Sequence, residues 1–349
     1  MARKKRQWLL VTGLLLVVVI AVTAAIGMRY YRYLYHSTVA SSPGDKIIHI
    51  ATGSGIDQLV DTLLSRQLIE DEKAFRWVAE MKKYDSNIKP GRYRVPAGLN
   101  NDALVNLLRS GKQEPVQLIV QEVRTLPELA LLFARQLEPD SAAFMHVFQE
   151  HEKVKEWGFN DTTIMTMFLP NTYEFYWNTS AGGTLERMYK EYDRFWTRER
   201  DNKAAAQGLN RREVYTLASI VYAETKKKDE AATIAGVYLN RINRKMPLEA
   251  DPTLIFAKGD FTIRRVLNED KLVDSPYNTY RNLGLPPGPI NMPPIAWIDA
   301  VLNAAQHDYI FFCAREDFSG YHNFAATLSE HNRNAARYRH ALNQRRIYR

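Results

Sequence analysis

The sequence predicts an α+β protein with one apolar helix at its N-terminus, and three observations support this class. An uncharged run of 21 residues, Trp8–Met28, lies near the start of the chain. Short β-branched segments then alternate with helical patterns up to about residue 115. Mostly helical patterns follow, including two strong segments at Arg211–Thr225 and Asp229–Arg244. The length of 349 residues is enough for two or three domains that each bury a core.

The composition excludes several classes of protein. Hydrophobic residues make up 46% and charged residues 25% of the chain, which excludes a disordered or collagen-like protein. A single cysteine, Cys313, excludes a disulfide framework and a zinc-finger cluster. The net charge of +8 comes from the chain ends, because residues 1–35 and 331–349 each contain six basic and no acidic side chains. The body between them is slightly acidic, so we expect no nucleic-acid partner.

The N-terminal apolar run has the length and flanking charges of a membrane anchor. As a helix it would extend about 31 Å, close to the roughly 30 Å core of a bilayer. Four basic residues precede it and only Arg29 and Arg32 follow closely, so the positive-inside rule predicts a cytoplasmic tail at 1–7, a transmembrane helix at 8–28 and an extracytoplasmic body. The run is longer than the apolar region of a typical signal peptide, but small residues around Ala21–Ala25 leave cleavage as the alternative.

A linker and a small α/β domain are predicted after the anchor. The linker covers 29–45 and ends in the turn-forming stretch Val39–Asp45. The domain covers 46–115. Its expected elements are strands at Lys46–Ala51 and Gly91–Val95, helices at Ile56–Arg66, Glu70–Lys83 and Ala103–Leu108, and a helix-ending Gly111.

A larger mixed α+β domain is expected over 116–349. A β-branched strand at Val116–Val123 is followed by helices at Leu126–Leu137 and Ser141–Glu152. The aromatic stretch Phe168–Trp177 contains a Pro-Asn pair and is predicted to be a loop. The last third of the domain is predicted to contain a long loop at Ser275–Pro294 and a helix at Ile295–Ala305. An aromatic strand at Tyr309–Ala314 and a basic helix from about Ser329 are expected to follow.

Glu224 is the first candidate for catalytic chemistry. It continues an apolar stripe of its helix, seven residues after Leu217 and three after Val221. A carboxyl on an interior face has a raised pKa, which a general acid needs at neutral pH. The alternative is that the helix ends near Thr225 and leaves Glu224 solvated beside Lys226–Lys228.

A second acid of this helix has a structural explanation. Glu213 is the last residue of Asn210-Arg-Arg-Glu213, the pattern of a capping box that precedes an apolar run. We therefore expect Glu213 to stabilise the start of the helix.

The loop Ser275–Pro294 is the second candidate. Its hydroxyl, amide and aromatic side chains are suited to sugar binding, namely Tyr277, Asn278, Thr279 and Tyr280. Prolines and glycines would keep the loop rigid, with little entropy to lose on binding. At about 20 residues it is longer than most connections without a function. An ordinary connecting loop remains the alternative.

Three further motifs are weak signals when taken alone. Asp251-Pro-Thr253 is typical of a turn. His322-Asn323 and His331-Asn332 have a spacing that fits no local metal motif, so we expect structural histidines and no metal. Cys313 lies among aromatic residues and is expected to be an inert thiol.

Several short segments form a pattern when they are taken together. They are LASIVYAET at 217–225, YLNRI at 238–242, ADPTLI at 250–255, YNTY at 277–280, GLPPG at 284–288, HNF at 322–324 and His331-Asn332. In combination and in this order, these segments resemble the YceG-like family of endolytic murein transglycosylases. The family's catalytic glutamate matches Glu224. Two positions depart from the family pattern, which often has acidic residues where this chain has Tyr222 and Asn171.

The resemblance implies a single-pass protein of the bacterial cytoplasmic (inner) membrane with a LysM-like module at 46–115 and a catalytic domain at 116–349. The implied reaction is cleavage of the MurNAc-β-1,4-GlcNAc bond of peptidoglycan with formation of a 1,6-anhydro end. The implied role is to terminate or trim nascent strands beside membrane-bound synthases, without a metal or other cofactor. Glu224 would be catalytic, and the substrate would be bound by Asp251, Thr253, Tyr277, Asn278, Thr279, Tyr280, His322, Asn323 and Asn332.

Two other functions remain open. In a conventional two-carboxylate hydrolase, Glu224 would act with Glu174 or Asp251 and the products would have reducing ends. In a non-catalytic envelope scaffold, the protein would bind glycan without cleaving it.

Overall fold

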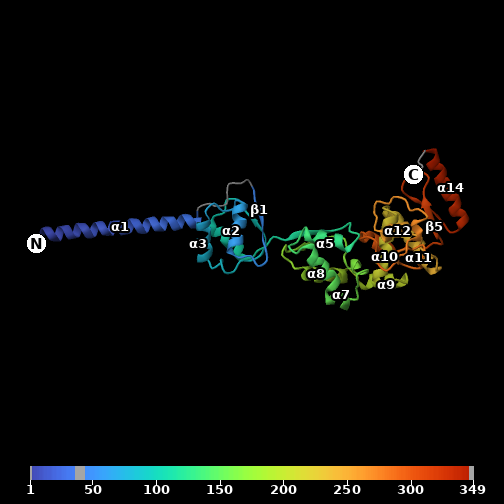
Figure 1. The fold of residues 1–349 in the computed structure, drawn as a ribbon, viewed down its shortest axis with the longest axis horizontal. Coiled ribbons are helices and arrows are strands. Elements are labelled where there is room, and N and C mark those ends of the chain that lie inside the picture. The colour runs from blue at the N-terminus through green and yellow to red at the C-terminus, as the bar shows by residue number, and fades with distance from the viewer. Residues whose placement is uncertain (1, 36–43, 346–349) are drawn as a thin grey trace. The chain divides into compact units, whose positions relative to one another are not determined.

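The computed structural model describes residues 2–35 and 44–345 and has the mixed α+β fold that the sequence predicts (Figure 1). Contacts within the chain divide it into two compact units. The first unit is Met1–Val116 together with Glu174–Asn178, and the second is Gln117–Tyr173 together with Thr179–Arg349. Each unit has its own core and is described separately.

The first element, α1, is a continuous helix over Ala2–Tyr35. Its segment Trp8–Tyr35 is long and apolar enough to cross a membrane, and the large apolar side chains of Trp8–Met28 are exposed. The helix continues through Arg29–Tyr35, where the sequence analysis expected the linker to begin. The rest of that expected linker, 36–43, lies outside the described residues.

A two-stranded antiparallel sheet and three helices form the core of the first unit. β1 (Lys46–Ile50) pairs with β2 (Gly91–Val95), and the helices are α2 (Ile56–Ser65), α3 (Glu72–Met81) and α4 (Asn101–Ser110). These elements agree with the predicted ones. Gly111 ends α4 with φ 71°, the left-handed conformation that glycine adopts without strain. The core side chains include Ile48, Leu63, Phe75, Tyr93 and Leu104.

The last turns of α1 pack on this core. Tyr30 stacks on Trp77 with ring centroids 4.7 Å apart, and Leu34 contacts the core cluster. The side chain of Asn101, fully buried, donates to the carbonyl of Tyr33 at 2.9 Å. The C-terminal end of the apolar helix is therefore part of the small unit.

The sequence analysis mispredicted the aromatic segment Phe168–Trp177. It contains a strand, β4 (Asn171–Phe175), which pairs with β3 (Val116–Val120). The Pro-Asn pair stands where the strand begins, and no loop continues after it. Tyr173 and Phe175 alternate with exposed residues, which is the two-residue period of a strand with one buried face.

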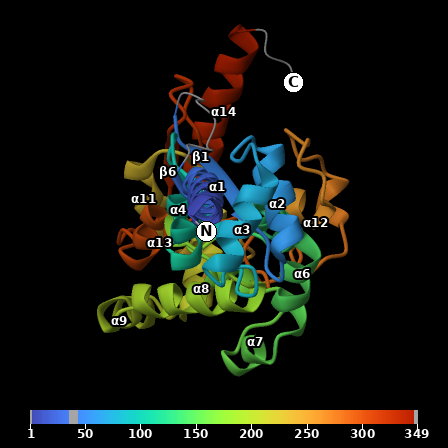
Figure 2. The ribbon, with the colours of Figure 1, turned by 90° about the vertical axis from the view of Figure 1, so that its left-hand side faces the viewer.

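Helices make up most of the next part of the second unit. They are α5 (Leu126–Ala134), α6 (Ser141–Glu150), α7 (Glu152–Glu156), α8 (Ala181–Phe195) and α9 (Arg198–Ala206), with a short 3₁₀ turn at Ile164–Met167. α6 contacts both α7 and α8 (Figure 2). A phenylalanine cluster fills the space between α5, α6 and the segment before β4, and consists of Phe133, Phe144, Phe148 and Phe168.

Three helices build the core around the candidate site. α10 (Arg211–Glu224) packs against α11 (Lys228–Asn243) and α13 (Ile295–Leu302). Gly236 permits the close approach of α11 to the chain after α13, because a Cβ there would lie 2.4 Å from the carbonyl oxygen of Ala305.

The C-terminal elements include two that the sequence analysis did not predict. α12 (Asp251–Lys258) begins where a turn was expected, because Pro252 is tolerated in the first turn of a helix. β6 (His322–Ala325) pairs with β5 (Phe311–Ala314) in an antiparallel hairpin. The chain then forms α14 (Leu328–Gln344), which packs on this hairpin (Figure 1).

Candidate active site

The predicted capping box determines where α10 begins. The side chain of Asn210 accepts hydrogen bonds from the backbone N–H groups of Arg212 and Glu213, and Glu213 accepts one from the Asn210 N–H. From this start, α10 buries Leu217 and Val221 completely. Glu224 is its last residue and lies at the inner end of this stripe.

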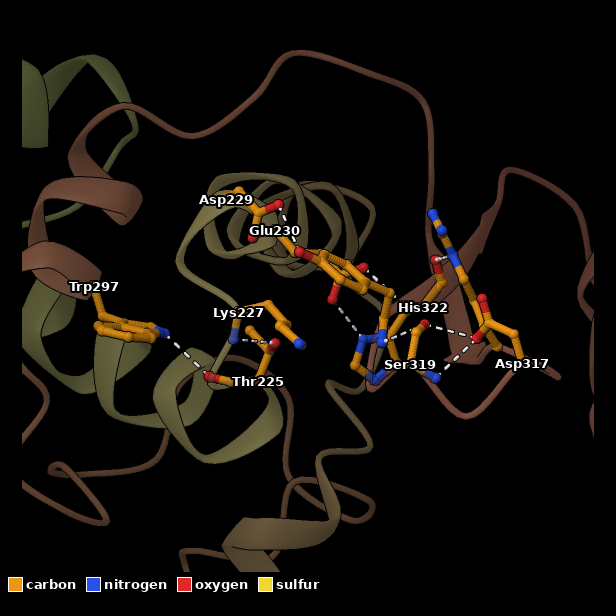
Figure 3. A network of polar contacts seen from close by, with 10 residues as sticks. Thr225, Lys227, Asp229, Glu230, Trp297, Asp317, Ser319 and His322 are labelled. Carbon is orange, nitrogen blue, oxygen red and sulfur yellow. Dashed lines mark hydrogen bonds and ion pairs between the residues drawn. The ribbon is translucent and has the colours of Figure 1, made fainter.

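The turn after Glu224 is held by hydrogen bonds from two elements (Figure 3). Thr225 is 3% exposed, and its carbonyl accepts from the Trp297 indole N–H of α13 at 3.2 Å. Its hydroxyl accepts from the backbone N–H of Lys227 at 3.0 Å. The Trp297 ring also meets Tyr222 edge to face, with centroids 5.0 Å apart. These contacts fix the end of α10 and therefore the position of Glu224.

The Glu224 carboxyl has properties that suit a general acid. Its residue is half-buried, and Oε1 accepts a hydrogen bond from the Tyr238 hydroxyl at 2.9 Å. Burial raises the pKa of Glu224 to about 7, against the opposing effect of that hydrogen bond and with a further contribution from the charge of Asp251. A group with this pKa exchanges a proton readily near neutral pH.

A second carboxyl lies close enough to influence the first. Asp251 opens α12, and its Oδ1 accepts a hydrogen bond from the Tyr280 hydroxyl at 2.6 Å. Burial and the Asp251 hydrogen bond raise the pKa of Tyr280, so this tyrosine stays protonated and donates. Two predicted site residues, Asp251 and Tyr280, thus interact electrostatically with Glu224.

Three other predicted binding residues make hydrogen bonds inside the protein, and two of them join the loop to the start of α12. Asn278 is fully buried; its amide donates to the carbonyls of Lys271 and Val273 and accepts from the Tyr280 N–H. Thr279 accepts from the Ala250 N–H and shares a 2.8 Å hydrogen bond with Thr253, which is also fully buried. The polar groups of these three residues therefore have hydrogen-bond partners inside the protein. They position Asp251 and Tyr280.

The remaining loop tyrosine has an aromatic partner. Tyr277 is half-buried and packs on Phe256 of α12 with ring centroids 4.7 Å apart. The loop itself has no regular helix or strand, as the sequence predicts, apart from a single bridge between Pro247 and Leu283.

The predicted substrate-binding residues near the C-terminus belong to the β5–β6 hairpin and to α14. The backbone N–H of His322 donates to Oε1 of Glu230 at 2.8 Å, and its Nδ1 lies 2.7 Å from Oε2 (Figure 3). Asn323 donates to Glu316, and Asn332 is exposed on α14. The His322 ring meets Phe312, which in turn meets Tyr238, so His322 is linked to the Glu224 site through packed rings.

No group of three or more potential metal ligands from His, Cys, Asp and Glu is found in the part of the chain that the structure describes. Cys313 is half-buried in β5, and burial raises the pKa of its thiol. A raised pKa makes a cysteine less reactive.

Two residues of the site were missed in the sequence analysis. Tyr238 lies in the YLNRI segment. Nothing local in that segment indicates that its hydroxyl donates to Glu224, which is 14 residues earlier in α10. Glu230 reads as a first-turn acid of α11, whereas it is 5% exposed and binds His322. Both assignments depend on how α10, α11 and the hairpin pack.

A cavity of about 700 Å³ adjoins the last turn of α10. Tyr222 and Ala223 line it from α10, Phe256 from α12 and Met292 from the long loop. Tyr222, one of the two departures from the family pattern, is thus part of its wall.

A carboxyl with a pKa of about 7, a neighbouring acid and an adjoining cavity are features typical of enzyme sites that use general acid–base catalysis. The model of the YceG-like family matches residues 48–337, which is most of the chain. The chain belongs to the YceG-like family.

Similar proteins agree with this membership. The chain is 29% identical over 318 residues to an endolytic murein transglycosylase of Bacillus subtilis, covering 85% of this chain and 86% of that protein. It is 27% identical to an endolytic murein transglycosylase of Streptococcus pneumoniae, covering 91% of this chain but 63% of that longer protein. A solved structure of a YceG-like protein from Listeria monocytogenes matches with a TM-score of 0.55 and 27% identity, covering 84% of this chain and 99% of that one.

Proposed function

We propose that this protein is an endolytic lytic transglycosylase that cleaves the MurNAc-β-1,4-GlcNAc bond of peptidoglycan. The observation that carries the proposal is the Glu224 carboxyl, whose pKa burial raises to about 7 at the end of a fixed helix. Family membership and the names of the relatives supply the substrate class. Within the site, Tyr238 positions Glu224, and Asp251 and Tyr280 form its polar neighbours.

The proposed reaction uses Glu224 twice. The protonated carboxyl first donates its proton to the glycosidic oxygen, and the bond from that oxygen to C1 of the muramoyl residue breaks. The resulting carboxylate then takes the proton of the C6 hydroxyl of the same sugar, whose oxygen bonds to C1. This closes the 1,6-anhydro ring, returns Glu224 to its protonated form and consumes no water.

An intramolecular nucleophile explains why one carboxyl is sufficient for the reaction. Most glycoside hydrolases need a second carboxylate to activate water or to attack C1. Here the C6 hydroxyl is already held near C1, which replaces a bimolecular step by a unimolecular one.

The decisive test is Glu224→Gln in the full-length protein. Gln keeps the size of the side chain but transfers no proton, so anhydro product should fall by about 10² to 10⁴-fold. Muropeptide analysis by mass spectrometry measures it. Unchanged cleavage by Glu224→Gln would rule out this mechanism, and glycan binding without any cleavage by the unaltered protein would favour the scaffold function.

Glu213→Gln is the matched control on the same helix. Glu213 serves the capping box, so its substitution should cost about 1 kcal/mol of stability and leave turnover nearly intact. If Glu213 were essential and Glu224 dispensable, the acid would have been assigned to the wrong turn of α10.

A conventional hydrolase is the second candidate, because Asp251 lies close enough to Glu224 to raise its pKa. In that mechanism Asp251 would activate water, and the product would carry a reducing end. The two products differ in mass by one water. Asp251→Asn should abolish hydrolysis, whereas it should only weaken the anhydro-forming reaction.

The rest of the chain supports a role at the membrane surface. The apolar helix would be a single-pass anchor of the inner membrane, with the N-terminus in the cytoplasm and both units outside it. The small unit would be a LysM-like module that holds glycan strands, and neighbouring synthases would supply the nascent strands. The enzyme would then terminate or trim those strands.

A further inference from the structure

The cavity beside Glu224 is not explained by the bond cleavage itself. It is lined by Tyr222 and Ala223, which directly precede Glu224, and by Pro252, which directly follows Asp251. Glu224 is not among the lining residues. The cavity thus adjoins the sequence neighbours of both carboxyls.

Part of the cavity wall is apolar. Ile255 and Phe256 contribute from α12, Phe261 and Ile263 from the segment after it, and Met292 from the long loop. A volume of about 700 Å³ lies within the range of about 300–1,000 Å³ that is typical of ligand pockets.

Charged side chains of both signs form another part of the cavity wall. Arg124 and Lys226 carry positive charge, and Glu122 and Glu128 carry negative charge. The Arg124 guanidinium lies over the Phe261 ring at 4.7 Å, which keeps it over the cavity. Burial and the Arg124 charge lower the pKa of Lys226, so these two cations interact across the same space.

This combination of apolar side chains with charges of both signs matches a short peptide better than a neutral sugar. The peptide stem of peptidoglycan carries carboxylates and, when it contains a diamino acid, an ammonium group. It is attached to the muramoyl sugar, the same sugar whose C1 reacts in the proposed function. A stem that leaves this sugar on the side of Ala223 and Pro252 would enter the adjoining cavity.

We propose that this cavity is a subsite for the stem peptide of the muramoyl residue that is cleaved. Arg124 and Lys226 bind the carboxylates of the peptide, and the apolar wall packs on its side chains. The inference rests on the proposed function, and it makes peptide-bearing strands better substrates than strands whose peptides have been removed.

The test compares two substrates with the full-length protein in detergent. Uncross-linked glycan strands that carry peptides are compared with the same strands after an amidase has removed the peptides. The unaltered protein should cleave the peptide-bearing strands with a higher kcat/KM. Arg124→Gln should lower this preference by about 10-fold, mainly through KM, because a charge-assisted hydrogen bond is lost. Equal cleavage of both substrates by the unaltered protein would overturn the inference.

Arg194→Gln is the control, since Arg194 is an exposed arginine of α8 that does not line the cavity. It should leave the preference unchanged. A loss of preference in Arg194→Gln equal to that in Arg124→Gln would indicate a general charge effect and would also overturn the subsite.

A binding measurement separates failure of the subsite from failure of the proposed function. The Glu224→Gln protein should bind peptide-bearing strands about 10-fold more tightly than denuded strands, and adding Arg124→Gln should remove that difference. If the unaltered protein cleaved neither substrate while binding stayed peptide-dependent, the proposed function would be refuted and the subsite would be kept. Cleavage without any peptide dependence would keep the function and refute the subsite.

Discussion

The ionisation of Glu224 connects catalysis with stability. The first step of the proposed reaction requires the protonated carboxyl, and burial raises its pKa to about 7. We therefore expect kcat/KM to be constant below about pH 7 and to fall about tenfold per unit above it. A pH–rate profile measures this. A profile that falls only below pH 5 would mean that Glu224 acts as a carboxylate from the start.

The same raised pKa predicts how stability depends on pH. Below the unfolded value near 4.5, Glu224 is protonated in both states and imposes no penalty. Between about 4.5 and 7 the folded state binds more protons, so stability decreases as pH rises and the full penalty applies above 7.

The Glu224→Gln variant should escape this loss. It should become more stable than the unaltered protein as pH rises from 4.5 to 7, by an amount on the order of 2–3 kcal/mol. Urea unfolding at pH 4.5 and pH 8 measures the difference. A difference that is independent of pH would show that the folded state does not shift this pKa.

Tyr238 is the hydrogen-bond partner of the proposed acid. Its hydroxyl donates to Oε1 of Glu224 at 2.9 Å and stabilises the carboxylate. Tyr238→Phe removes that donor, so the pKa of Glu224 should rise further, by about one unit. The alkaline limb of the pH–rate profile should move to higher pH, while kcat falls. A lower kcat with an unmoved limb would indicate a purely structural effect.

At the scale of elements, the site depends on the contact between α12 and the loop Ser275–Pro294. Asn278, buried in this loop, bonds three backbone groups, and Asn278→Ala would leave those groups without a partner. We expect a loss of about 2–4 kcal/mol in the free energy of unfolding. Urea unfolding measures the loss, and activity should fall with it because Tyr280 and Asp251 are no longer held.

Asn282→Ala is the matched control in the same loop. Asn282 is exposed, although its amide also donates to two carbonyls. Water can replace these bonds, so the loss should stay below about 1 kcal/mol. If Asn278→Ala kept its stability but lost activity, Asn278 would contact substrate after all.

At the scale of the whole molecule, the charges around the apolar helix predict the topology. Arg3, Lys4, Lys5 and Arg6 precede the apolar run, so the N-terminus should stay in the cytoplasm. A reporter that is active only outside the cytoplasm should be active when fused after Arg349. A soluble protein that begins near Ala25 would show that the helix is removed as a signal peptide.

The sequence by itself determined the features that depend on local pattern. The helical period over Arg211–Thr225, the capping box of Asn210 and the glycine that ends α4 all act over a few neighbouring residues, and all three were predicted. The same period indicated that Glu224 continues an apolar stripe. The resemblance added the family, which the comparison with the family model supports.

The tertiary structure alone decided which polar groups face each other. Asn278, Thr279 and Tyr280 are adjacent in the sequence, yet the first two hold the loop and the third meets Asp251. Tyr238 reaches Glu224 only because α10 and α11 pack side by side. The physical reason is that local sequence fixes backbone periodicity, whereas the partner of a buried polar group is set by whichever distant segment packs against it.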